Sequence, residues 1–280
     1  MSRDLAPEPR EIDSERAIPN ERPDLGKRFE RERSREIYNL LSPREKETLF
    51  DLGRFRTIAV EDLLKLRYAG KRGELNKDLE SWLALGLVQK RTALVAKGRL
   101  KLNVMVLTKA GRRAVQHHKT NTAQAIYSGF VKPGEVAHDA AIYRMFHKEA
   151  ALIENAKGSI KRVVLDYELK RKVYSPLAKA RHKSPAPSAS EYARLQEQVA
   201  CENHLKVVNG KIPLPDLRIE YETVQGETAR VDLELATHHY HGSHLREKAA
   251  AGFKMYGDAD ATRRSPVFEE REITAAILSL

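Results

Sequence analysis

The chain has 280 residues, with 50 Lys and Arg against 39 Asp and Glu and a formal net charge of +11. Such a basic surplus attracts polyanions through long-range electrostatics and through release of their condensed counterions, which favours nucleic acid as the partner. A single cysteine, Cys201, excludes an intrachain disulfide and a zinc site built on several thiolates. No apolar run approaches the ~20 residues of a membrane span, so no membrane partner is expected.

The N-terminal residues are rich in charge and proline and lack the apolar core of a secretory signal. Together with the single cysteine, which fits a reducing compartment, this predicts a cytoplasmic protein. We expect a charged, flexible segment at residues 1–36, running into a charged helix over 26–41.

The next block has clear helix signals. Ser42-Pro43-Arg44-Glu45 combines a capping serine, a proline at the first helical position and a glutamate three residues after the cap. Apolar spacing then predicts a helix to about Arg54, a short helix over 59–68, and a third helix from Lys71 to Gly86. Two strands follow, at 87–92 and 100–108, and another helix begins near Thr108.

Three short helices followed by two strands are the order of a winged helix-turn-helix. The segments Leu85-Gly86-Leu87-Val88 and Leu107-Thr108-Lys109-Ala110-Gly111 resemble that superfamily closely. The resemblance implies a DNA-binding domain at residues 37–118.

Charge placement favours the same interpretation, because eight basic residues and no acidic residue lie between positions 90 and 113. A basic wing is able to follow the phosphate backbone while the third helix enters the major groove. The predicted DNA-binding residues are Lys71, Arg72, Asn76 and Lys77 on the helix and Lys90, Arg91, Lys97, Arg99 and Lys101 on the wing. The alternative is that these charges are solvated and the domain binds protein.

Turn signals predict a linker at residues 119–136 and a second domain at 137–280. In this domain we expect a helix over 138–157, a strand over 159–174, a mobile basic loop at 175–190 and a helix over 190–206. Two strands then flank a turn at Gln225-Gly226, followed by a helix over 242–258 and a last strand near 272–278.

Acidic residues mark the two central strands. Asp216 follows Pro215 at the start of the first strand. On the second strand, period-2 alternation places Val231, Leu233 and Leu235 on one face, and Asp232, Glu234 and Ala236 on the other. Acids on one strand face are commonly only solvent-exposed, so the pattern alone does not establish a site.

The order helix, strand, strand, strand, helix, strand, with Pro215-Asp216 and Asp232-Leu233-Glu234, resembles the PD-(D/E)XK nuclease superfamily. With the winged helix and His138-Asp139 opening a helix, the whole arrangement resembles the plasmid replication-relaxation family of mobile-element proteins. The resemblance implies an α+β protein with a restriction-endonuclease-like αβββαβ domain, acting in replication, relaxation or transfer of a plasmid or mobile element.

The resemblance also implies a chemistry. Carboxylates on adjacent strands hold divalent ions in that superfamily, which makes Asp216 and Glu234 the implied ligands of Mg²⁺ or Mn²⁺, with Asp232 beside them. The lysine of the motif is expected at position 236, where this chain has Ala236. Lys248 on the next helix is the candidate replacement, and Glu149 or Glu154 is a candidate further ligand. The missing lysine leaves catalytic activity open.

Three functions therefore compete: a DNA-binding factor with an inactive nuclease-like domain, a metal-dependent endonuclease or nickase, and a protein that recruits a replication or conjugation enzyme. An oligomer is compatible with each. A local cluster comprises His238, His239, His241 and His244. It is interpreted as lining a strand–helix turn, although a transition-metal site is the alternative.

Overall fold

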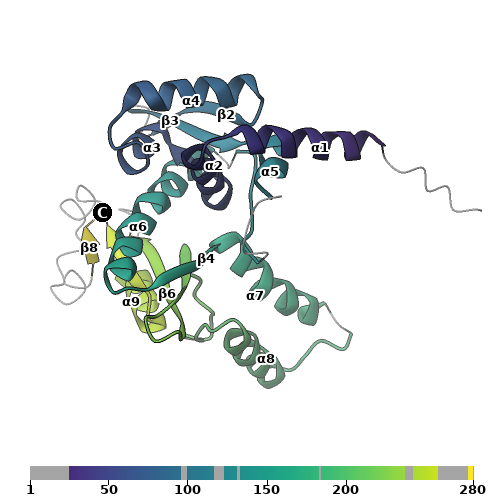
Figure 1. The fold of residues 1–280 in the computed structure, drawn as a ribbon. Coiled ribbons are helices and arrows are strands. Elements are labelled where there is room, and N and C mark those ends of the chain that lie inside the picture. Colours follow the sequence, from purple (N-terminus) through teal and green to yellow (C-terminus); the bar gives the residue numbers. More distant parts are fainter. Residues whose placement is uncertain are drawn as a thin grey trace, which may run out of the picture.

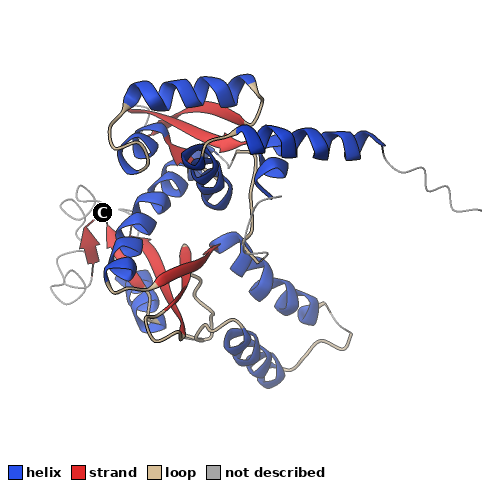
Figure 2. Cartoon of the chain, in the orientation of Figure 1, coloured by secondary structure: helices blue, strands red, loops and turns tan. Residues whose placement is uncertain are grey.

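The computed structural model describes residues 25–95, 100–116, 123–130, 133–182, 184–236, 242–257 and 277–279. It is a mixed α+β structure with two separate sheets, as the sequence predicts (Figures 1 and 2). No helix in these ranges combines the length and apolar character that crossing a bilayer requires.

The first half is built around a three-stranded antiparallel sheet in the order β1-β3-β2. Its elements are α1 (Leu25–Leu40), α2 (Pro43–Phe55), β1 (Ile58–Ala59), α3 (Val60–Leu66), α4 (Arg72–Ala84), β2 (Val88–Val95), β3 (Leu100–Leu107) and α5 (Lys109–Gln116). The helices and the β2–β3 hairpin match the predicted order, whereas the two-residue β1 is too short to give a period in the sequence.

Two sequence motifs of this half have clear structural reasons. Ser42 and Glu45 form the predicted capping box at the start of α2. Gly111 lies so close to β2 that an added Cβ would be 2.0 Å from the carbonyl oxygen of Leu87. The Thr108 hydroxyl accepts a hydrogen bond from the Gly111 amide and donates one to the Gly86 carbonyl. This glycine is therefore required for the close approach of α5 to the hairpin.

The second half is a five-stranded sheet in the order β4-β5-β6-β7-β8, in which β4, β5 and β6 are antiparallel and β6, β7 and β8 are parallel. Its elements are α6 (Val136–Asn155), β4 (Ser159–Leu165), α7 (Asp166–Arg181), α8 (Ala189–Glu202), β5 (Leu217–Glu222), β6 (Thr228–Ala236), α9 (Gly242–Ala251), β7 (Lys254–Gly257) and β8 (Ile277–Ser279). The predicted turn between β5 and β6 contains Gly226 with φ +81°.

Three predictions for this half are wrong. The strand expected over 159–174 ends at Leu165, and α7 continues to Arg181, into the first part of the loop expected at 175–190. Leu169, Val173 and Leu177 are buried at a spacing of four, which is helical, so one face of this segment packs as a helix. The helix expected over 242–258 ends at Ala251, because Gly252 adopts φ +89° and β7 follows.

The segment between the halves is bonded to both of them. The Gln124 side chain accepts from the Val163 amide and donates to the Val163 carbonyl, and the Tyr127 amide donates to the Gly53 carbonyl. Within the described part of the predicted linker, the chain is thus held by specific hydrogen bonds to α2 and β4.

One hydrophobic cluster continues from the first half into the second through α2 and α6. The Phe55 ring contacts the rings of Tyr143 and Phe146, with centroids 5.1 and 4.8 Å apart. α6 in turn packs on the sheet face that carries Leu233 and Leu235. A second cluster, formed with α7, α8 and the end of α9, covers residues on the opposite face.

A buried ionic network also joins the two halves. The Asp51 carboxylate, fully buried on α2, accepts hydrogen bonds from Arg54, from Arg67 Nε at 2.6 Å and from the Tyr143 hydroxyl at 2.9 Å. Burial by itself raises the pKa of Asp51, but the charges of Arg54 and Arg67 outweigh it and hold the pKa below its usual value. The carboxylate is therefore ionised and bridges α2, the end of α3 and α6.

Candidate functional site

Asp216, the residue before β5, lies opposite Glu234 of β6. Leu217 of β5 pairs with Leu233 of β6, so the antiparallel register places the residue before β5 across from Glu234. The Glu234 side chain is fully buried, and Asp216 Oδ2 accepts a hydrogen bond from the Leu235 amide at 2.9 Å. The two carboxylates predicted from the motif are thus brought together on one face of the sheet.

Lys248 completes this group. Its ammonium on α9 lies 2.8 Å from Glu234 Oε1 and donates to the Leu214 carbonyl at 2.6 Å. Ala236, where the motif's lysine was expected, is buried beside β7 in the sheet. The cation of the site therefore comes from a helix that covers the strands, as the sequence suggested.

Asp232 shares the face of Glu234 but has a different contact. Arg218, directly opposite on β5, binds it through Nε and Nη2 at 2.6 and 2.8 Å. The same guanidinium donates to the carbonyls of Asn203 and His204 at the end of α8. Asp232 and Arg218 thus link the sheet to the end of α8, and Asp232 does not share the Lys248 contact of Glu234.

His138 contacts the acidic pair from a third element. Its Nε2 lies 3.3 Å from Asp216 Oδ2, and its Nδ1 lies 3.4 Å from Asp139 Oδ1 on the same helix, α6. Burial lowers the pKa of His138, but hydrogen bonds and charges from the two aspartates outweigh it and raise the pKa to about 10. A protonated imidazole at the start of α6 therefore faces Asp216.

The two further acids considered on α6 do not join the group. Glu149 accepts hydrogen bonds from the Tyr256 hydroxyl at 2.6 Å and Lys254 Nζ at 2.7 Å. Lys254 and Tyr256 of β7 pair with Leu233 and Leu235 of β6, whose side chains face α6. Glu149 therefore contacts the sheet face opposite to the one that carries Glu234. Glu154 is exposed near the far end of the helix.

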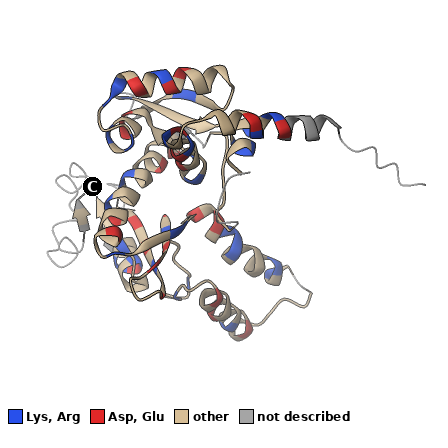
Figure 3. Ribbon diagram, viewed as in Figure 1, with Lys and Arg blue, Asp and Glu red and all other residues tan. Residues whose placement is uncertain are grey.

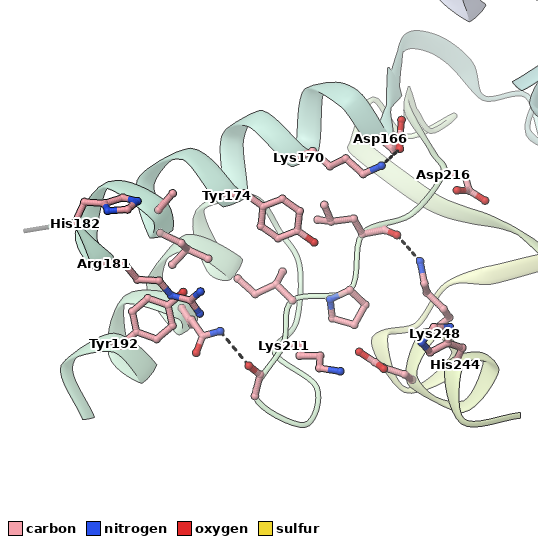
Figure 4. Close-up of a pocket in the computed structure, with 18 residues that line it drawn as sticks. Asp166, Lys170, Tyr174, Arg181, His182, Tyr192, Lys211, Asp216, His244 and Lys248 are labelled. Atoms are coloured by element: carbon pink, nitrogen blue, oxygen red, sulfur yellow. Dashed lines mark hydrogen bonds and ion pairs between the residues drawn. The ribbon is translucent and has the colours of Figure 1, made fainter. Parts of the chain in front are cut away.

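A cavity of 760 Å³ lies beside the acidic pair, between α7, α8, α9 and the segment that leads into β5 (Figure 4). Asp216, Lys248 and His244 line one end of it, and Arg181, His182 and Tyr192 line the other. Asp216 and Lys248 therefore face the hollow, whereas Glu234 is fully buried and does not line it.

The histidine cluster is only partly described, because His238, His239 and His241 lie outside the described residues, whereas His244 lines the cavity. Across the described ranges, no three His, Cys, Asp or Glu side chains gather in an arrangement that would hold a metal ion. Cys201 is an exposed free thiol on α8.

The predicted DNA-binding residues that the structure describes lie on α4 and its N-cap, and on the β2–β3 hairpin. On α4, Asn76 and Lys77 are exposed, whereas Arg72 pairs with Glu61 at 2.9 Å and Lys71 with Glu74 at 3.3 Å. Acidic and basic residues therefore alternate along this helix (Figure 3).

On the hairpin, Lys90 and Lys101 are exposed on the face that carries Met105, which packs in the core formed with α4. Arg91 points to the other face and stacks over the Phe130 ring at 4.0 Å. Lys97 and Arg99 lie outside the described residues.

No family model, curated protein or solved structure matches the chain.

Proposed function

We propose that this chain is a DNA-binding protein whose first half binds duplex DNA in the manner of a winged helix-turn-helix. The order α2, α3, α4 followed by the β2–β3 hairpin supports this proposal, because it provides one exposed helix and one basic hairpin. The role in replication, relaxation or transfer of a mobile element rests on the sequence resemblance.

The observation that carries the proposal is the placement of exposed polar side chains on α4 and on one hairpin face. Asn76 and Lys77 extend from the helix, and Lys90 and Lys101 extend from the adjoining sheet face. An asparagine is able to bind an adenine edge in two places, whereas lysines bind phosphate as point charges. In this proposal α4 contacts bases and the hairpin contacts the backbone.

We expect the double substitution Lys90→Ala and Lys101→Ala to weaken duplex binding about tenfold, because two charge-assisted contacts to phosphate are lost. Fluorescence anisotropy with a labelled duplex measures the change. Lys179→Ala removes an exposed charge from α7 and serves as the matched control, with affinity unchanged. An unchanged affinity in the double variant would rule out the hairpin as the backbone contact and turn attention to a protein partner.

The grouping of Asp216, Glu234 and Lys248 favours a second candidate function, a metal-dependent DNA nuclease. The order α6, β4, β5, β6, α9, β7, with α7 and α8 inserted, supports comparison with the αβββαβ core of the PD-(D/E)XK superfamily. Two carboxylates from neighbouring chain segments and a lysine in contact with one of them are the residue types that such a centre uses.

The residues present fit a magnesium ion. Mg²⁺ is commonly held by one or two carboxylates, with water and substrate phosphate as its other ligands. Asp216 lines the cavity, and the buried Glu234 lies opposite it across the β5–β6 register. The ion would supply an activated water and stabilise charge on the phosphate. Lys248 would neutralise negative charge on the scissile phosphate, and His138 would orient Asp216 through its hydrogen bond.

A further inference from the structure

The cavity beside Asp216 is formed largely by α7 and α8, two helices that are not part of the αβββαβ element order. α7 and α8 lie between β4 and β5 and project from the sheet as a pair (Figure 1). Together with α9 they enclose the hollow. The chain thus adds a binding surface next to Asp216 that the sheet alone does not create.

Two tyrosine rings, Tyr174 and Tyr192, line this hollow together with charged side chains (Figure 4). Tyr174 is 49% exposed and lies between the two ends, and the Arg181 guanidinium stacks over the Tyr192 ring at 4.6 Å. Rings of this kind stack on nucleobases whatever the base, and an arginine over a ring reinforces such a platform. Leu177, Ile212 and Leu214 also line the hollow, and they are buried members of the second hydrophobic cluster.

The lining carries four basic side chains, Lys170, Arg181, Lys211 and Lys248, against three acidic ones, Asp166, Asp216 and Glu247. Lys170 and Lys248 are paired with Asp166 and Glu234, whereas Lys211 and Arg181 make no ion pair with a carboxylate among the described residues. These two cations are available to a phosphate chain that passes the tyrosines. A cavity of 760 Å³ has the volume of a small-molecule site, which suits unstacked nucleotides rather than a base-paired helix.

We propose that this cavity binds an unpaired stretch of a DNA strand and leads it to Asp216, the acid of the candidate site that lines the cavity. The ligand class rests on the proposed DNA-binding function, but the binding itself requires no catalysis. The expected substrate is therefore DNA with a single-stranded segment next to a duplex, the duplex lying on α4 and the hairpin.

The test uses the full chain and a fluorescein-labelled oligothymidine of about ten nucleotides, within the usual range of single-strand sites. Anisotropy is measured in EDTA, so that cleavage does not interfere. Tyr174→Ala with Tyr192→Ala is expected to weaken binding about tenfold or more, because each stacked base loses its platform. Tyr192→Phe keeps the ring and is expected to bind normally. Lys211→Ala is expected to weaken binding, whereas Lys179→Ala, on α7 but outside the cavity, is not.

Three outcomes would overturn the proposal: an unchanged affinity in the double tyrosine variant, loss of oligothymidine binding in the Lys90 and Lys101 variant instead, or thymidine monophosphate competing as strongly as the oligonucleotide. The last would assign the cavity to free nucleotides. A duplex titration runs in parallel. Tyrosine-dependent oligothymidine binding without any duplex binding would support the cavity and refute the role of α4, so the two failures are distinguishable.

Discussion

Replacing Asp51 with alanine is expected to lower the free energy of unfolding by about 3–5 kcal/mol, because it leaves buried positive charge without its partner. The Asp51 side chain is completely buried, and the side chains of Arg54 and Arg67 are only 13% and 24% exposed. Tyr143 of α6 would also lose its hydrogen-bond acceptor. Equilibrium unfolding in urea, followed by circular dichroism, measures the loss.

Glu61→Ala is the matched control, since it breaks the exposed Arg72–Glu61 pair on the neighbouring helices. Water and salt screen exposed pairs, so only a small change is expected. Equal losses in the two variants would mean that the Asp51 network does not stabilise the contact between α2 and α6.

Asp216→Asn and Glu234→Gln are each expected to reduce Mg²⁺-dependent nicking of supercoiled plasmid DNA about hundredfold or more, if the second candidate function is correct. Both changes keep the side-chain shape and remove the charge that would hold the ion, which is worth several kcal/mol to the transition state. Lys248→Met should reduce cleavage similarly through loss of the cation beside Glu234.

Glu222→Gln makes the same charge change at the far end of β5, where Glu222 pairs with Lys161 at the surface. It should cleave like the unmodified protein. Nicking that survives in both carboxylate variants would exclude this site as its source. Absence of nicking in the unmodified protein, with duplex binding retained, would leave the DNA-binding function alone.

Local patterns predicted the residues that meet in the candidate site. The alternation of residues along β6 correctly predicted that Leu233 and Glu234 lie on opposite faces of the sheet. The motif paired Asp216 with Glu234, and the strand register places these two residues opposite each other. The position of Lys248 followed from the expected helix after β6. These features depend on short-range periodicity and on one strand pairing, which a sequence encodes directly.

Contacts set by packing between distant elements were not predictable in the same way. Arg218 faces Asp232 only because of the β5–β6 register, and its other bonds go to the end of α8. His138 reaches Asp216 because α6 begins beside the start of β5. The helical α7 was mistaken for a strand because β-branched residues precede its first turn, while its buried stripe appears only over a longer window.

The most direct test of the proposed DNA-binding function is the affinity for duplex DNA measured over a series of salt concentrations. We expect a linear fall of log K with log salt, and a slope smaller by about two in the Lys90→Ala, Lys101→Ala variant, one for each lost phosphate contact. Affinity that does not change with salt, or a slope identical in the variant, would contradict binding through the hairpin.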